Sequence, residues 1–481
     1  MGFTSQLFVF IFAPFCFMAY FVIHGLEKVK GIGNFIKEKR IKDIVLIMIC
    51  IVFYAFAFAI DVIKLLLLVV FIYSMAKVIE KKREHGSGFT VLKVAVIVLV
   101  LGLIYFKYTE FLSYNITRLF MDNPVTYSVM APLGISFITF SAISYVVDVY
   151  RKDAKAGSFI DCLLFITFFP KVISGPIVLW KDFSGQINNR VYSVDCFEKG
   201  IRRIITGFAK KAILADTFGF AISEMTIGSI DQVTAVGSLF IYMLQIYYDF
   251  SGYSDIAIGL SNILGFDFSE NFNFPYRSKS ISEFWRRWHI SLGTWFRQYI
   301  YFPLGGSRKG KFRTLVNLGV VFALTGIWHG AGWTYILWGA INGVIVIVEH
   351  MIKDKEFYKK IPDFVKYTVT MLIVLCFWQF FRCYNLSEVA TVLKTALGIE
   401  KATFIPYTWK YFFDLRMIVF MIIGTLGATV LGSSKLKEKY NKFACTKIGC
   451  IVQETGLVLL LIVSLMFVVS ATYSPFIYFQ Y

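Results

Sequence analysis

The sequence predicts an all-α protein that crosses a membrane many times, and two observations lead to this fold class. Hydrophobic residues make up 57% of the 481 residues and charged residues only 17%, whereas soluble domains average roughly 45–50% and about 25%. The apolar residues also form runs of about 20, the length of helix that spans a bilayer. Because backbone groups in lipid must be satisfied internally, we expect these runs to be helices.

The apolar runs predict ten to thirteen transmembrane or re-entrant helices, since some runs could be fused or could enter and leave the same face. The first run is expected to stay as a span, because no basic region precedes it and no small-residue cleavage site follows it. The candidate ranges are 6–23, 44–60, 62–79, 91–107, 128–148, 159–180, 203–224, 232–250, 314–328, 332–348, 366–384, 416–433 and 455–473.

The positive charge predicts the orientation of the chain in the membrane. Net charge is +18, and basic clusters around Lys37, Lys81 and Arg151 follow the first, third and fifth runs. Basic loops stay in the cytoplasm, so we expect these loops inside and the amino terminus outside. No nucleic-acid-binding motif accompanies the charge, and we expect no nucleic-acid partner.

The sixth run, 159–180, contains residues that cannot continue a regular helix. Pro170, Gly175 and Pro176 fall within the segment FFPKVISGP, and proline removes a helical hydrogen bond. Irregular backbone at membrane depth is tolerated only where it is buried in protein. We therefore expect a broken or re-entrant element here.

The long polar segment 267–313 is predicted to contain an amphipathic helix that carries the first candidate histidine. Ser280 and Glu283 form a capping-box pattern. One helix starting there would place Trp285, His289 and Leu292 on a single stripe, with arginines elsewhere around it. His289 is a candidate catalytic residue, and the alternative is a purely interfacial helix with an aromatic belt and snorkelling arginines.

The second candidate histidine, His329, lies midway through the apolar stretch 314–348. A single helix over this stretch would be about 52 Å long, too long for a bilayer core of about 30 Å. Gly330 and Gly332 predict a break there. An imidazole at the break would face protein or a water-filled cavity, and burial without a countercharge would keep it neutral and available as a base. The alternative is a structural histidine that forms hydrogen bonds between packed helices.

Two carboxylates, Asp249 and Asp255, lie between neighbouring apolar runs. Either could orient a histidine, position a substrate or cap a helix that begins after Gly252. We predict the capping role for Asp255 and leave Asp249 open.

A glycine-rich basic turn, residues 305–311, matches the spacing of a phosphate-binding loop up to Lys311. Phe312 replaces the magnesium-binding hydroxyl residue and no parallel sheet is expected, which excludes a nucleotide hydrolase. The turn could contact phosphate groups of a donor, although a solvated charge run explains it equally. No His/Cys spacing indicates a metal site.

Three long strings carry a family resemblance: YYDFSGYSDIAIG, ENFNFPYRSKSISEFWRRWHISLGTWFRQYIYFPLGG and GIWHGAGWTYILWG. They resemble the membrane-bound O-acyltransferase family, and most of all its bacterial branch for O-acetylation of alginate and other polysaccharides. The resemblance is densest over residues 130–350, whereas 1–129 and 351–481 match only as generic membrane sequence. It implies a single membrane-embedded acyltransferase domain over 1–481 in a bacterial cell membrane.

The resemblance also implies a function. Such an enzyme moves an acyl group, here acetyl, from a cytoplasmic thioester such as acetyl-CoA to an acceptor reached from the other face. The family's invariant histidine corresponds to His329 and its second characteristic histidine to His289. An extracytoplasmic acetyltransferase partner and a polysaccharide acceptor are expected, with no tightly bound cofactor and no metal.

The chemistry suits these residues. Attack of a hydroxyl on a thioester needs a base and donors for the tetrahedral oxyanion. His329 is the expected base, and His289, Trp or Tyr donors, or backbone N–H groups near Gly330 are candidate oxyanion donors. Phosphates of coenzyme A or an acidic carrier protein could bind basic residues on the cytoplasmic side, namely Arg286, Arg287, Arg308 and Lys309.

Two other functions fit a polytopic membrane protein. A transporter or flippase for an exopolysaccharide precursor would also have broken helices and buried ionisable groups, but it usually shows paired halves, which this sequence lacks. A non-catalytic scaffold of a polysaccharide synthase would tolerate replacement of His329.

Overall fold

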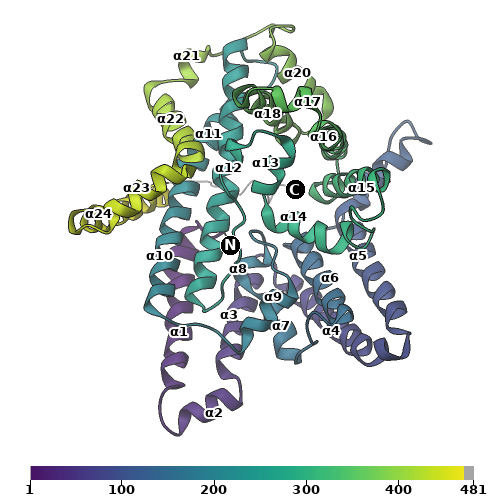
Figure 1. Ribbon diagram of the computed structural model, residues 1–481, viewed down its shortest axis with the longest axis vertical. Coiled ribbons are helices and arrows are strands. Elements are labelled where there is room, and N and C mark those ends of the chain that lie inside the picture. The colour runs from purple at the N-terminus through teal and green to yellow at the C-terminus, as the bar shows by residue number, and fades with distance from the viewer. Residues whose placement is uncertain (1, 471–481) are drawn as a thin grey trace. The chain divides into compact units, whose positions relative to one another are not determined.

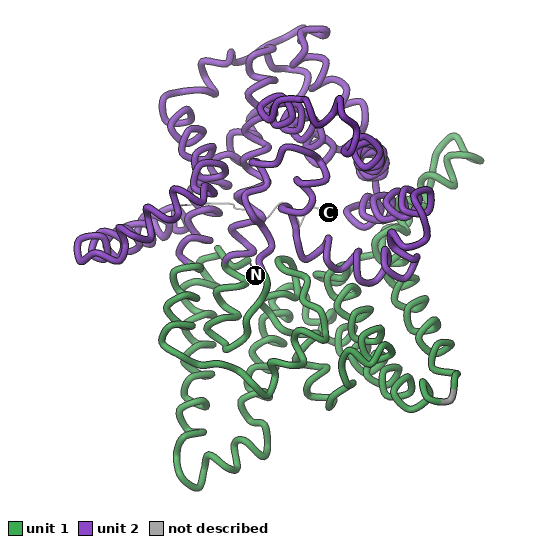
Figure 2. The backbone as a smooth tube through the Cα atoms, in the orientation of Figure 1, with its two compact units in different colours: residues 1–204, 256–269 green, residues 205–255, 270–481 purple. Residues whose placement is uncertain are grey.

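The computed structural model describes residues 2–470, and this part of the chain is helical with no strand (Figure 1). The helices form two compact units, which Figure 2 distinguishes by colour. The first unit contains residues 1–204 and 256–269, and the second contains residues 205–255 and 270–481. Each unit is described by itself.

The first unit consists mainly of the amino-terminal helices. Helices α4, α5 and α6 pack against one another, and α3 packs against α1, α7 and α8. The elements of this unit are η1 (Phe8–Phe12), α1 (Ala13–Leu26), α2 (Ile32–Glu38), α3 (Ile41–Ala55), α4 (Ala59–Lys82), η2 (Arg83–His85), α5 (Gly88–Thr117), α6 (Ile135–Arg151), α7 (Phe159–Thr167), α8 (Phe169–Val172), α9 (Trp180–Ile187) and most of α10 (Val194–Phe208).

The sixth predicted run is broken, as expected. It forms the short helices α7, α8 and the start of α9, and residues 168–180 between and within them are buried. Lys171 on α8 is 3% exposed, with Nζ 3.1 Å from Ser141 Oγ and 4.0 Å from the centre of the Phe165 ring. Backbone at this position is therefore enclosed by protein, which satisfies the requirement for irregular structure at membrane depth.

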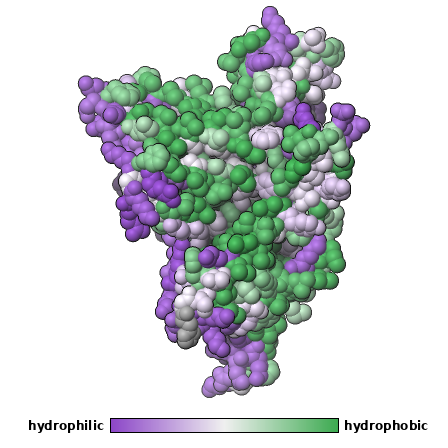
Figure 3. Space-filling view, turned by 90° about the vertical axis from the view of Figure 1, so that its right-hand side faces the viewer, coloured by the Kyte–Doolittle hydropathy of each residue, from purple (hydrophilic) through white to green (hydrophobic). Residues whose placement is uncertain are grey.

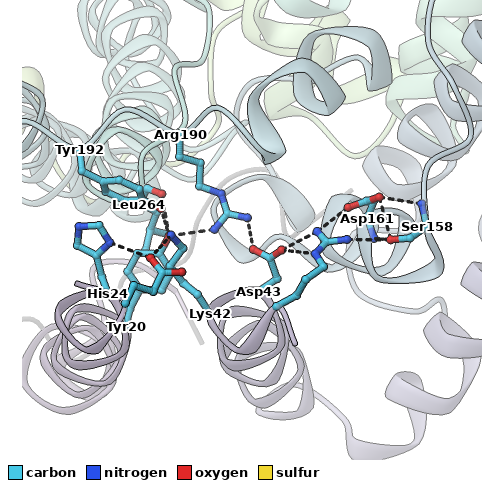
Figure 4. A network of polar contacts seen from close by, with 11 residues as sticks. Tyr20, His24, Lys42, Asp43, Ser158, Asp161, Arg190, Tyr192 and Leu264 are labelled. Carbon is cyan, nitrogen blue, oxygen red and sulfur yellow. Dashed lines mark hydrogen bonds and ion pairs between the residues drawn. The ribbon is translucent and has the colours of Figure 1, made fainter. Parts of the chain in front are cut away.

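A polar network joins several segments of the first unit (Figure 4). The Arg190 side chain, which is 3% exposed, donates to Tyr20 Oη at 3.1 Å and forms an ion pair with Asp43. Arg40 links Asp43 to Asp161, with Nη2 2.6 Å from Asp161 Oδ1. Because these charges are paired and hydrogen-bonded, the network holds α1, α3 and α7 to the segment around Arg190.

The second unit contains the candidate site. Helices α15 and α16 form its most extensive pairing, and a Cβ on Gly326 would lie 2.6 Å from Tyr335 O. The elements of this unit are η3 (Ala209–Ala215), α11 (Asp216–Glu224), most of α12 (Gln232–Ile263), η4 (Pro275–Arg277), α13 (Ile281–Arg287), α14 (Ile290–Phe296), η5 (Arg297–Tyr301), α15 (Lys311–His329), α16 (Trp333–Ile352), α17 (Glu356–Lys360), α18 (Asp363–Phe377), α19 (Gln379–Arg382), α20 (Leu386–Ala396), α21 (Trp409–Phe412), α22 (Leu415–Thr429), η6 (Val430–Gly432), α23 (Ser434–Ala444) and α24 (Lys447–Ser470).

Within residues 2–470, eight helices are long and apolar enough to cross a membrane. They match the predicted runs that begin at 6, 62, 91, 314, 332, 366, 416 and 455; residues 471–473 of the last run lie outside the described residues. The other predicted runs form shorter, broken or more buried helices. The all-α polytopic fold class is confirmed.

Large apolar side chains are exposed along the spanning helices. Examples are Phe15 on α1, Leu67 on α4 and Met466 on α24, all more than 60% exposed. Figure 3 shows broad hydrophobic areas on one face of the molecule, with hydrophilic side chains gathered toward parts of its margin. Such surfaces are stable only against an apolar medium, so these helices lie in lipid.

Candidate active site

The second unit brings the two predicted histidines to the same tryptophan. The imidazole of His289 lies 6.3 Å from the Trp328 ring, and that of His329 lies 4.9 Å from it, measured between ring centroids. His289 is 2% exposed, His329 6% and Trp328 6%. Two imidazole rings that are far apart in the sequence therefore lie beside the same buried indole ring.

His289 does not lie within one continuous helix, and the prediction of a single helix after Ser280 is wrong. Helix α13 ends at Arg287, Trp288 is extended, and α14 begins at Ile290. His289 itself has φ +45°, a left-handed conformation that costs about 1–3 kcal/mol in a non-glycine residue. Such strain persists only where the surroundings impose it, and it occurs often at functional sites.

The start of α13 is capped much as predicted. Ser280 Oγ accepts the Glu283 N–H at 3.0 Å. The Glu283 carboxylate accepts from the backbone N–H of Lys279 instead of that of Ser280, so only half of the capping box forms. Burial would raise the pKa of Glu283, but the hydrogen bonds from Lys279 and Arg287 outweigh it and lower this pKa.

Aromatic packing holds the chain at the break. Trp288 N–H donates to Phe284 O at 2.8 Å, and the Trp288 ring lies 4.6 Å from that of Trp378 on the α18–α19 junction. Phe250 on α12 meets the imidazole of His289 edge to face at 4.7 Å. These contacts, which depend on distant helices, explain why the helical period of 280–296 does not continue through residue 289.

Asn271 is the nearest polar partner of His289, ahead of the Ser291 hydroxyl at 3.4 Å, and the sequence did not point to it. Its Oδ1 lies 3.1 Å from His289 Nδ1, and its backbone carbonyl accepts from Ile290 N–H at 2.9 Å. Asn271 is 1% exposed and stands in the irregular string ENFNFPY, where no periodicity marks it. Burial lowers the pKa of His289 to about 3, so this imidazole is neutral at physiological pH.

His329 is the last residue of α15, and the predicted break follows it. Gly330 and Gly332 are extended and α16 begins at Trp333, so this prediction is confirmed. A Cβ on Gly330 would lie 2.3 Å from the Tyr335 ring. The imidazole of His329 packs edge to face against Trp338 at 5.2 Å and Phe381 at 5.1 Å.

The two carboxylates form ion pairs with lysines on the preceding helical segment. Lys211 Nζ lies 2.8 Å from Asp249 Oδ1 and 2.5 Å from Asp216 Oδ1, and Lys210 Nζ lies 2.6 Å from Asp255 Oδ2. The capping role predicted for Asp255 is wrong, because α12 runs unbroken through this region. A Cβ on Gly252 would lie 2.9 Å from Gly207 O, so the glycine permits close packing and does not end a helix.

The basic residues predicted to bind the acyl donor do not take part in a buried ion pair. Arg286, Arg308 and Lys309 are exposed, whereas Arg287 pairs with Glu283 at 2.8 Å. The glycine-rich turn has positive φ at Gly305, Gly306 and Gly310. Across residues 2–470 no cluster of three or more His, Cys, Asp or Glu residues has the arrangement of a metal site.

Comparison with known proteins decides the family. The model of the membrane-bound O-acyltransferase family matches residues 49–420. The chain belongs to the membrane-bound O-acyltransferase family. The match extends well beyond the strings that suggested it, and it includes α12 to α16 and both histidines. Since members of this family are acyltransferases, the protein is an O-acyltransferase that crosses a bacterial membrane several times.

Relatives of this O-acyltransferase cover nearly the whole chain. A probable alginate O-acetylase AlgI of Pseudomonas aeruginosa is 36% identical over 93% of this chain and 84% of its own length. The protein of the same name in Pseudomonas putida is 39% identical over 81% of this chain and 84% of its own. A peptidoglycan O-acetyltransferase of Helicobacter pylori is 29% identical over 100% of this chain and 97% of its own. The catalytic roles of His289 and His329 remain predictions.

Proposed function

We propose that this enzyme moves an acetyl group from a cytoplasmic thioester to an acceptor on the other side of the membrane, as one step in the O-acetylation of a polysaccharide. The observation that supports this function is the convergence of two buried histidines, from two helix ends, on one indole. The relatives named for alginate and peptidoglycan O-acetylation support acetyl as the group and a polysaccharide as the final acceptor.

His329 is the proposed base. Its imidazole takes the proton of the acceptor hydroxyl while the hydroxyl oxygen attacks the thioester carbonyl carbon. The resulting oxyanion needs hydrogen-bond donors. When it collapses, the carbon–sulfur bond breaks, the imidazolium returns its proton to the leaving thiolate, and an ester and a free thiol remain. A thioester is already activated, so this step needs no metal.

The donor and acceptor reach the site from opposite faces in this proposal. Acetyl-CoA or another acyl thioester enters from the side of the basic loops, where the exposed Arg286, Arg308 and Lys309 offer charge for phosphate groups or an acidic carrier. The acceptor is a polysaccharide, or an extracytoplasmic acetyltransferase partner that completes the transfer.

Label transfer in liposomes tests the function. The purified protein is reconstituted with radiolabelled acetyl-CoA on one side and a candidate acceptor on the other, and wild type is compared with His329→Ala. We expect transfer by the wild type and a loss of about 10²–10⁴-fold in the variant. His350→Ala, a histidine at the far end of α16, is the matched control and should keep wild-type activity.

Two outcomes would contradict the proposal. Equal transfer by wild type and His329→Ala would remove the base assignment. No transfer by a correctly folded wild type, with any donor and acceptor supplied, would favour a scaffold or a transporter instead.

A further inference from the structure

The amide of Asn271 has one orientation that satisfies all of its neighbours. Its Oδ1 accepts the backbone N–H of Ser291 at 3.3 Å and the Ser291 hydroxyl at 2.8 Å. A backbone N–H can only donate, so the atom that faces it must be the amide oxygen. The opposite atom, Nδ2, donates to Ser254 Oγ at 3.0 Å. Amide orientations are assigned from such networks, and here a main-chain donor makes the assignment unambiguous.

This orientation determines the tautomer of His289. Asn271 Oδ1 lies 3.1 Å from His289 Nδ1, and an amide oxygen can only accept. Nδ1 must therefore carry the proton. In a neutral imidazole the other nitrogen, Nε2, then has a lone pair and no hydrogen. His289 Nε2 is buried and has no hydrogen-bond partner among residues 2–470.

We infer that Asn271 is a positioning residue that locks His289 in the Nδ1–H tautomer, so that His289 acts in catalysis as an acceptor at Nε2 and not as an oxyanion donor. The catalytic part of this inference rests on the proposed function, whereas the tautomer does not. An oxyanion needs N–H or O–H groups, and the neutral Nδ1–H form presents none at Nε2. A substrate N–H or O–H group, other than the hydroxyl whose proton His329 takes, is the group that suits this lone pair.

The local fold supports a positioning role. Asn271 holds the residues that follow the break, because its backbone carbonyl accepts from Ile290 N–H while its side chain binds His289 and Ser291. The left-handed conformation of His289 turns the ring toward this amide instead of along a helix stripe. A buried nitrogen without a hydrogen-bond partner, on a residue in a strained backbone conformation, is the arrangement expected of a group kept free for substrate.

Nitrogen NMR of the histidine rings tests the tautomer directly. The chain has five histidines, so protein labelled with ¹⁵N-histidine gives few signals, and His289→Gln identifies the signal of His289 by its loss. At neutral pH we expect that signal to show a protonated Nδ1 and an unprotonated Nε2. In Asn271→Leu this preference should disappear. A protonated Nε2 in the wild type would overturn the inference.

Acyl transfer measured against pH tests the catalytic part. Asn271→Leu should lower kcat by about 10- to 100-fold, which is part of the rate enhancement that acid–base catalysis supplies. Asn271→Asp keeps an oxygen acceptor at Nδ1–H and adds a negative charge, which favours the imidazolium. It should restore much of kcat. It should also move the acid limb of the plot of kcat against pH to higher pH by about one unit or more.

Asn262→Leu is the matched control. Asn262 is also a buried asparagine, and its amide donates to Phe266 O and Asp267 Oδ1 and not to a histidine. Its kcat and pH profile should stay near those of the wild type. Equal losses in Asn262→Leu and Asn271→Leu, or no shift of the acid limb in an active Asn271→Asp, would overturn the positioning role. If the wild type transfers no acyl group, the proposed function fails while the NMR result still decides the tautomer.

Discussion

Two histidines from different helix ends meet at one indole, and their surroundings differ. His329 is enclosed by aromatic edges, whereas His289 has an asparagine that holds one of its nitrogens. Burial keeps His289 uncharged at neutral pH, with a pKa of about 3. At the residue scale the site therefore contains two imidazoles in different surroundings, which agrees with the separate roles that we propose for them.

Replacement of His289 by alanine should abolish most acyl transfer and leave membrane insertion intact. The expected loss is about 10²–10⁴-fold, because the accepting nitrogen that the acid–base site needs is removed without a change in any spanning helix. Transfer is measured in liposomes, and a monodisperse size-exclusion profile is the folding control. A collapse of expression, or a variant that remains fully active, would show that His289 is structural or dispensable.

At the scale of elements, charged pairs and close helix contacts position the site. Lys211 lies on the π-helical turn η3 and pairs with Asp249 on α12, one residue before the Phe250 that contacts His289. Turns of this kind occur often at functional sites. The predicted helix start after Gly252 does not occur, so the unbroken helix α12 carries both Asp249 and Phe250.

Lys211→Met should destabilise the protein much more than Lys210→Met. Lys211 has a side chain only 4% exposed and neutralises two aspartates, whereas the Lys210 side chain is 25% exposed. Removal of one member of a buried pair costs about 3–5 kcal/mol, since the remaining charge is left without a partner. Thermal unfolding in detergent measures the difference, and equal melting temperatures for the two variants would contradict it.

Asp161 should make the first unit sensitive to acid. Burial would raise the pKa of Asp161, but the hydrogen bonds from Arg40 and from Ser158 at the start of α7 outweigh it and lower this pKa. A lowered carboxyl pKa contributes stability that is present above the unfolded value of about 3.9 and is lost as the pH falls through the folded value. At pH 7 the wild type should therefore have a higher melting temperature than Asp161→Asn.

The same comparison at low pH completes the test. Below about pH 4 the difference between wild type and Asp161→Asn should shrink, because Asp161 loses its charge as the pH falls through its lowered folded pKa. The pKa of Glu283 is also lowered, but Glu283 is present in both proteins, so its contribution to stability cancels in the comparison. A difference that stays constant from pH 7 to pH 3 would exclude the charge of Asp161 as its source.

At the scale of the whole molecule, apolar helices and basic loops define how the enzyme lies in a bilayer. Eight helices within residues 2–470 suit a membrane span by length and apolarity, and large apolar side chains on them face outward. The basic loops predict which ends are cytoplasmic, and under the proposed function this orientation decides the face from which the thioester enters.

Reporter fusions test the orientation. A fluorescent protein that matures only in the cytoplasm should be active when fused after Glu84, beyond α4, and inactive when fused after Asp122, beyond α5. An alkaline phosphatase that is active only outside should give the opposite pattern, because basic clusters hold their loops inside. The reverse pattern would place the basic loops outside and the donor on the other face.

Local features of the sequence were enough to predict the membrane fold class, the breaks at Pro170 and Gly330, the cap at Ser280 and the family. Each of these depends on local composition, on short-range backbone chemistry or on long distinctive strings. Packing in the folded chain, in contrast, places His289 in a left-handed turn against Asn271, pairs Asp249 and Asp255 with lysines, and brings both histidines to Trp328. These features arise where helices distant in the chain pack together, and packing between distant segments leaves no periodic signal in either one.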